Sequence, residues 1–192
     1  MIVTGRRLSQ VIDEDPWFGI LERFPSVLHA RASLAYDMNT DTLQRAFVHC
    51  LCQLQESIRS MELSLSDHPG YLDGTVGFRV GVGNQEGFDI LDIQEEDRVL
   101  RRIEAKGVFQ TLDFALDLHY KVRGPGRHRV QGDRYMTRMS FQPDRVEVLV
   151  HHLKGLKRVQ PDELVHFLLS LLNKELAKKG YREVELETLQ TD

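Results

Sequence analysis

The chain has 192 residues, of which 41% are hydrophobic and 28% are charged, with a formal net charge of −4 and a pI near 6.1. This composition is ordinary for a globular protein and excludes a disordered chain. A domain of this length buries about 70% of the surface that its unfolded chain exposes, so it needs no metal or disulfide for stability.

The sequence predicts neither export nor membrane insertion. Residues 1–7 lack the apolar core of a signal peptide, and the most apolar stretch, 164–172, is too short to span a bilayer. Cys50 and Cys52 lie two apart in a helical pattern, so they point to different sides and cannot bridge each other. We interpret both as reduced thiols and expect a cytoplasmic protein.

Residues 1–25 predict an N-terminal helical segment. Asp15 suits an N-cap, and Pro16 suits the first helical position. The apolar residues that then recur at helical spacing are Trp17, Ile20, Leu21 and Phe24. A strand over 27–36 and a second amphipathic helix over 39–58 follow.

Alternating apolar residues predict antiparallel strands over 61–65, 76–82, 112–122, about 128–141 and 146–150. Gly81 and Gly83 invite a phosphate-loop interpretation, but no helix start follows them, and a hairpin turn at Gly83-Asn84 fits better. The apolar positions of 128–141 slip by one residue, which predicts a β-bulge at Gly132.

Two further helices complete the predicted fold. A short surface helix spans 92–107, a long amphipathic helix spans 161–179, and residues 181–192 form a tail or a short edge strand. This order predicts a single α+β domain over 1–192, with amphipathic helices packed on one face of a curved antiparallel sheet. The order is similar to that of helix-grip lipid-binding folds, without a shared motif, and the resemblance implies an apolar cavity between the sheet and the last helix.

Charge is distributed unevenly along the chain. Residues 119–159 carry 10 basic and 3 acidic side chains, whereas residues 1–118 carry 11 and 19, and residues 160–192 carry 4 and 7. In one interpretation the outward-facing cations pair with acids on neighbouring strands, such as Asp113 and Asp117. In the other, a basic hairpin surface contacts an acidic partner, protein or nucleic acid, through Lys121, Arg123, Arg127, His128, Arg129, Lys154, Lys157 and Arg158.

The evidence for nucleic acid or for catalysis is weak. A pI near 6.1 lacks the footprint of a dedicated nucleic-acid binder. Asp117 and His119 share a strand face, and His151 or His152 is a candidate third ligand, but no spacing in the sequence requires a metal. No G-x-S-x-G elbow is present.

The sequence therefore favours a non-enzymatic binding module with a basic hairpin surface. No catalytic residue, metal or cofactor is assigned, and no membrane partner is expected. Two alternatives stay open: a carrier with an apolar pocket between the sheet and the C-terminal helix, and an enzyme with a His/Asp site on the sheet.

Overall fold

The computed structural model describes residues 16–55, 57–64, 71–122 and 131–192. Its helices are α1 (Thr40–Leu54), α2 (Ile93–Lys106) and α3 (Pro161–Lys178). Its strands are β1 (Phe18–Gly19), β2 (Ala30–Ala35), β3 (Ile58–Ser64), β4 (Tyr71–Asn84), β5 (Phe88–Ile90), β6 (Thr111–Val122), β7 (Gln131–Phe141), β8 (Arg145–Lys154) and β9 (Glu185–Thr191).

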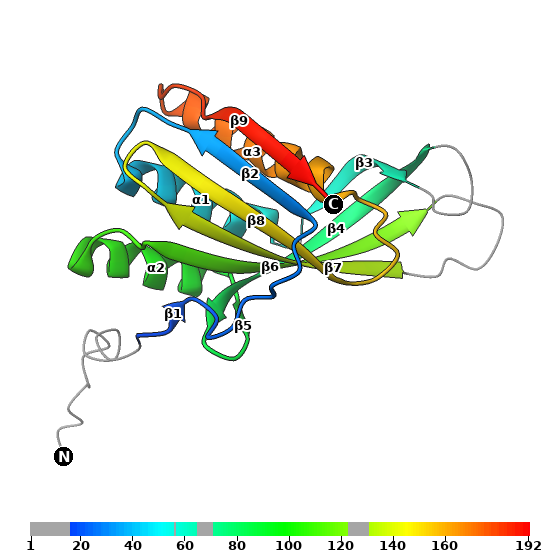
Figure 1. The fold of residues 1–192 in the computed structure, drawn as a ribbon, viewed down its shortest axis with the longest axis horizontal. Helices are drawn as coiled ribbons and strands as arrows, with labels where there is room; N and C mark the ends of the chain where they lie inside the picture. The colour runs from blue at the N-terminus through cyan, green and yellow to red at the C-terminus, as the bar shows by residue number, and fades with distance from the viewer. Residues whose placement is uncertain (1–15, 56, 65–70, 123–130) are drawn as a thin grey trace, which may run out of the picture.

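All nine strands belong to one antiparallel sheet. Its order is β1-β4-β6-β7-β8-β2-β9, and β3 and β5 both pair with β4. In Figure 1, α1 and α3 lie behind the sheet, and the segment before β2 runs across its front. The predicted α+β class, with the helices on one face and the long helix near the C-terminus, is confirmed, and the tail adds β9 as an edge strand.

Local sequence explains where the helices begin. The Asp92 side chain accepts hydrogen bonds from the amides of Gln94 and Glu95, which caps α2. Gln160 and Glu163 form a reciprocal capping box around Pro161 at the start of α3. No described helix has both the length and the apolarity needed to cross a bilayer.

The core lies between the sheet and the two helices behind it. The inward residues of β6 are at most 1% exposed: Leu112, Phe114, Leu116, Leu118 and Tyr120. Phe114 meets Phe47 of α1 edge to face, with ring centroids 5.6 Å apart, and Phe78 stacks on Phe167 of α3 at 5.2 Å. A hollow between the layers, lined by residues of α1, α3 and the sheet, has a volume of only about 10 Å³.

The predicted N-terminal helix is wrong for the part of it that the structure describes. Residues 16–25 instead contain β1, in which Phe18 and Gly19 pair with Asn84 and Gly83 of β4. Gly19 has φ +91°, a conformation that a helix interior does not allow. Residues 1–15 of the predicted segment lie outside the described residues.

The predicted bulge at Gly132 is also wrong. Strand β7 pairs with β6 without interruption from Gln131 to Ser140. The register shift lies on the other side of β7, where Arg134 faces Lys154 but Tyr135 faces His152, so Leu153 is the extra residue. Inward and outward residues of β7 alternate without a break. The inward position two residues before Tyr135 is occupied by Asp133, which is only 2% exposed.

Several strand ends meet at what we call the hairpin end of the sheet, where β6 leads into β7. Arg134 near the start of β7 faces Lys154 at the end of β8. Ala30 at the start of β2 faces Val150 of β8 on one side and Thr191 of β9 on the other. The last residues of β8 therefore lie at the same end of the sheet as the basic hairpin.

Candidate functional site

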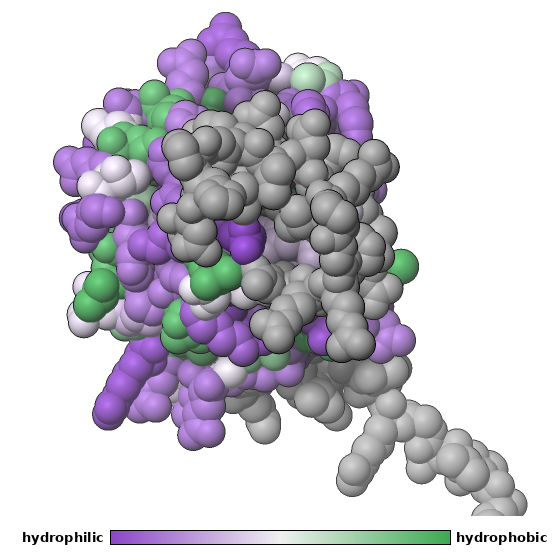
Figure 2. Space-filling model, turned by 90° about the vertical axis from the view of Figure 1, so that its right-hand side faces the viewer, coloured by the Kyte–Doolittle hydropathy of each residue, from purple (hydrophilic) through white to green (hydrophobic). Residues whose placement is uncertain are grey.

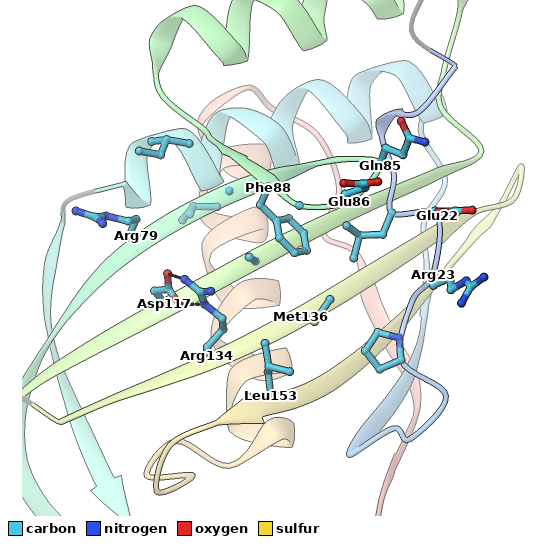
Figure 3. A pocket seen from close by; sticks show the side chains of 17 residues that line it. Glu22, Arg23, Arg79, Gln85, Glu86, Phe88, Asp117, Arg134, Met136 and Leu153 are labelled. Atoms are coloured by element: carbon cyan, nitrogen blue, oxygen red, sulfur yellow. Dashed lines mark hydrogen bonds and ion pairs between the residues drawn. The ribbon is translucent and has the colours of Figure 1, made fainter.

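A cleft of about 770 Å³ lies on the face of the sheet opposite α1 and α3 (Figure 3). Its floor comes from β6, β7 and β8, and the turn before β5 forms one wall. The second wall is the segment 20–29, which we call the strap. The apolar part of the lining includes Leu21, Phe88, Ala115, Met136 and Leu153.

An ion pair within the sheet fixes the strap. Asp113 is fully buried and accepts two hydrogen bonds from the Arg138 guanidinium, at 2.8 and 2.7 Å. The same carboxylate accepts a 2.7 Å hydrogen bond from the backbone amide of Leu21. The Arg138 guanidinium also lies over the ring of Phe24, 4.7 Å from its centroid. The strap is thus held by groups that the sheet has already ordered.

A second ion pair lies on the cleft floor. Both oxygens of Asp117 accept hydrogen bonds from Arg134, and this pairing raises the pKa of the Arg134 guanidinium further. Arg79 of β4 is the direct register partner of Asp117, but no described carboxylate forms an ion pair with it. In Figure 3 the Arg79 side chain lies at one end of the cleft, beside the Asp117–Arg134 pair.

The interpretation in which cations pair with acids on neighbouring strands is confirmed for Arg134 and Arg138, which pair with Asp117 and Asp113. The residues of the predicted basic hairpin surface are different ones. Arg123, Arg127, His128 and Arg129 lie outside the described residues, as does the side chain of Lys121. Lys154 is exposed and Lys157 is half-buried. Neither lysine forms an ion pair with a described carboxylate. Arg158 is half-buried in the loop that follows β8.

Asp133 orders that loop. Its carboxylate accepts hydrogen bonds from the Tyr120 hydroxyl at 2.6 Å, from His152 Nε2 at 3.1 Å, and from the amides of Lys157 and Arg158, both at 2.8 Å. Burial acts to raise the pKa of Asp133, but these hydrogen bonds outweigh it and lower the pKa below its usual range. Asp133 is thus an anion whose acceptor sites are occupied by the protein itself.

The loop also depends on a glycine. Gly155 has φ +113°, and a Cβ there would collide with the Asp133 carboxylate and the carbonyl of Gly132. Lys157 has φ +50°, which is rare for a residue with a side chain. The hydrogen bonds that the loop amides donate to Asp133 hold the backbone of this loop in place, including the backbone of Lys157.

Three histidines gather at the hairpin end. The ring centroid of His29, at the end of the strap, lies 5.2 Å from that of His151 and 6.1 Å from that of His152. His151 and His152 were candidate ligands from the sequence, whereas His29 was missed because no motif links it to β8. Within the described residues, no three His, Cys, Asp or Glu side chains converge in a way that could hold a metal ion.

The cysteines contribute no reactive thiolate. Burial raises the pKa of both Cys50 and Cys52 to about 12, and the hydrogen bond between Cys52 and Glu96 adds to the shift at that residue. Both thiols are free. They stay protonated near neutral pH, which removes them as nucleophiles.

Comparison of the chain with protein-family models, with curated proteins and with solved structures gave no match. The fold and the cleft therefore define the class of protein on their own. It is an α+β protein with helices on one face of its sheet and a strap-walled cleft on the other.

Proposed function

We propose that the protein is a non-enzymatic binding module that holds an acidic segment of a partner protein. The segment lies along the open face of the sheet, with its acidic side chains toward the cations of the hairpin end and its apolar side chains in the cleft. The observation that carries this proposal is that the carboxylates on the adjoining strands are already bound by other groups of the protein. Asp117 is taken by Arg134 and Asp133 by its four donors, so neither neutralises Arg79, Lys154 or Lys157.

Figure 2 looks onto the right-hand side of Figure 1, which is the hairpin end, and the described residues visible there are mostly hydrophilic. Arg79 and Lys154 are both exposed, and both come from strands that contribute to the cleft. An acidic partner can approach these cations without first displacing an internal carboxylate. Long-range attraction of this kind speeds association and weakens with salt.

The cleft favours a polypeptide over a nucleic acid. Leu153 and Phe88 offer apolar contacts for side chains, and the cations Arg79 and Arg23 lie at opposite ends of the cleft without a continuous row between them. A nucleic-acid groove instead combines a continuous cationic track with aromatic stacking platforms. The cleft also carries acids, Glu22 and Glu86, which would repel a phosphate backbone.

The test measures how tightly a labelled peptide of alternating glutamate and leucine binds, by fluorescence anisotropy at low and moderate salt. One exposed charge contact contributes up to about 1 kcal/mol, so Arg79→Glu and Lys154→Glu should each weaken binding about twofold to fivefold. Lys174→Glu reverses an exposed lysine on α3, away from the cleft, and should leave the affinity unchanged.

A second peptide separates the two parts of the contact. Replacing its leucines with serine should weaken binding to the natural chain, because the cleft then receives no apolar side chain. Equal loss with Lys154→Glu and Lys174→Glu would show a non-specific charge effect and overturn the proposal. Tighter binding of a single-stranded oligonucleotide than of the peptide would overturn the choice of a protein partner.

A further inference from the structure

The three-histidine cluster at the hairpin end also holds a cationic side chain. His29 precedes β2, His151 lies near the end of β8, and Lys157 lies in the loop that Asp133 orders. Partial burial and the positive charge of Lys157, with smaller effects of His151 and His152, lower the pKa of His29.

Hydrogen bonds assign the proton positions of two of the rings. The Nδ1 atom of His29 lies 3.0 Å from the backbone amide of His152, which can only donate. His29 Nδ1 is therefore unprotonated, and its Nε2 carries the hydrogen. The Nδ1 atom of His151 lies 2.6 Å from the carbonyl oxygen of Val27, which can only accept, so this nitrogen carries a hydrogen and donates.

These assignments give the two rings different capacities. The neutral His29 already presents an N–H donor at Nε2, and it cannot take a second proton without losing the contact with the His152 amide. The neutral His151 presents a lone pair at Nε2. It can take one proton there and keep its hydrogen bond to Val27, which turns it into a cation with donors at both nitrogens.

We propose that His29, His151 and Lys157 form a binding site for an oxyanion, a carboxylate or a phosphate group, and that binding is coupled to the uptake of one proton by His151. In the bound state His29 donates from Nε2 as a neutral ring, His151 donates as an imidazolium, and Lys157 supplies the ammonium. The proton enters from solvent, and no covalent bond forms or breaks.

The surrounding charges favour this site. His152 faces the same cluster, but its Nε2 atom is already hydrogen-bonded to Asp133. The acid that acts on His29 is Asp192, beyond the end of β9, and its effect is the smallest of the five that bear on that ring. The backbone of Lys157 is held in a conformation rare for a side-chain-bearing residue, and such positions are common at ligand sites.

This inference goes beyond the proposed function, with which it shares only Lys157, because it names a histidine-based anion site and its pH dependence from residues that do not line the cleft. Sulfate is the probe, since its charge does not change between pH 8 and pH 5.5. Binding is followed by two-dimensional NMR of the imidazole nitrogens at constant ionic strength, and by calorimetry in two buffers of different ionisation enthalpy. Sulfate affinity should rise at least about fivefold from pH 7.5 to pH 6, with uptake of about one proton.

Three variants distinguish the roles. His151→Gln should remove most of the pH dependence, and Lys157→Gln should weaken sulfate binding at every pH while keeping that dependence. His166→Gln changes an exposed histidine on α3 and should alter neither. Thermal unfolding of each variant checks that it is folded.

Sulfate affinity that does not change with pH, or that keeps its pH dependence in His151→Gln, would overturn this proposal. The outcome is separate from that of the proposed function. If sulfate binds as described but the glutamate–leucine peptide does not bind, the anion site stands and the acidic-partner proposal fails. The reverse result leaves the peptide contact and removes the histidine site.

Discussion

The two faces of strand β6 are stabilised in different ways. On the face toward α1 and α3, five alternate residues from Leu112 to Tyr120 are at most 1% exposed and pack into one apolar core. On the opposite face Asp113 and Asp117 each hold an arginine of β7, and His119 is exposed. One face is closed by helices, and the other by directed polar contacts and a strap.

Because of this difference, one face of the sheet supplies most of the apolar core, and the other leaves space for a ligand. Apolar burial is non-directional, and it leaves a hollow of only about 10 Å³ between α1, α3 and the sheet. Ion pairs fix two strands and the strap in defined positions but leave room between them. The cleft of about 770 Å³ lies on the face built in this second way.

Asp133 is the exception to this division, because it is a carboxylate on the helix side of the sheet. Asp133→Ala should cost about 4 kcal/mol, since it leaves two backbone amides and the Tyr120 hydroxyl without their acceptor. Urea unfolding of the variant and the natural chain at neutral pH measures the loss. A loss under about 1 kcal/mol would show that water replaces the carboxylate at no cost.

The pH dependence of that loss has a definite sign. The pKa of Asp133 is lowered in the folded state, so its contribution is complete above the unfolded value of about 3.9 and disappears as pH falls through the folded value. The stability gap between the natural chain and Asp133→Ala should therefore narrow below about pH 4. A gap that stays constant down to pH 2 would contradict the assigned ionic role.

Gly155 tests the same loop without removing the charge. Gly155→Ala should destabilise the protein by about 3 kcal/mol, because it adds a collision with Asp133 and Gly132 to a strained φ. Gly180→Ala is the matched control. It has φ +77° and no atom within 4 Å of the added Cβ, so it should cost only about 1 kcal/mol. Equal losses in the two variants would mean that backbone strain alone, and not the collision, sets the loss of stability.

Neighbouring residues on β6 compare the two faces directly. Leu118→Ala empties a fully buried position and should cost about 3 kcal/mol. His119→Ala changes the exposed residue beside it and should shift stability by less than about 0.5 kcal/mol. The measurement is the midpoint of urea unfolding at neutral pH. A large loss at His119 would mean that the open face contributes to the core.

Periodicity predicted most of the elements because a strand or helix with one buried face repeats that face in its sequence. It failed at Asp133, where a polar residue takes an inward position and satisfies a loop more than 20 residues away. It also failed over 16–25. Trp17, Ile20 and Leu21 have helical spacing, but Gly19 and the edge of β4 offered a better arrangement.

The candidate site was predicted only in part, for a related reason. The basic block indicated a segment rich in cations, and the register of β7 and β8 brings Lys154 to the hairpin end. Arg79 and His29 belong to segments far from that block. Their approach depends on strand order and on the path of the strap, which local patterns do not encode.

The two arginines of β7 give the last comparison, between a buried and a half-exposed ion pair. Arg138→Gln leaves the fully buried Asp113 with the Leu21 amide as its remaining donor, and should cost about 2 kcal/mol. Arg134→Gln releases Asp117, whose side chain is 18% exposed, and should cost less than about 1 kcal/mol. Hydrogen exchange adds a local readout. The Leu21 amide should exchange faster in Arg138→Gln and at its natural rate in Arg134→Gln, because of these two arginines only Arg138 contacts the strap and orients the carboxylate that binds this amide. Equal exchange in both variants would mean that the other contacts of the strap are sufficient to hold it.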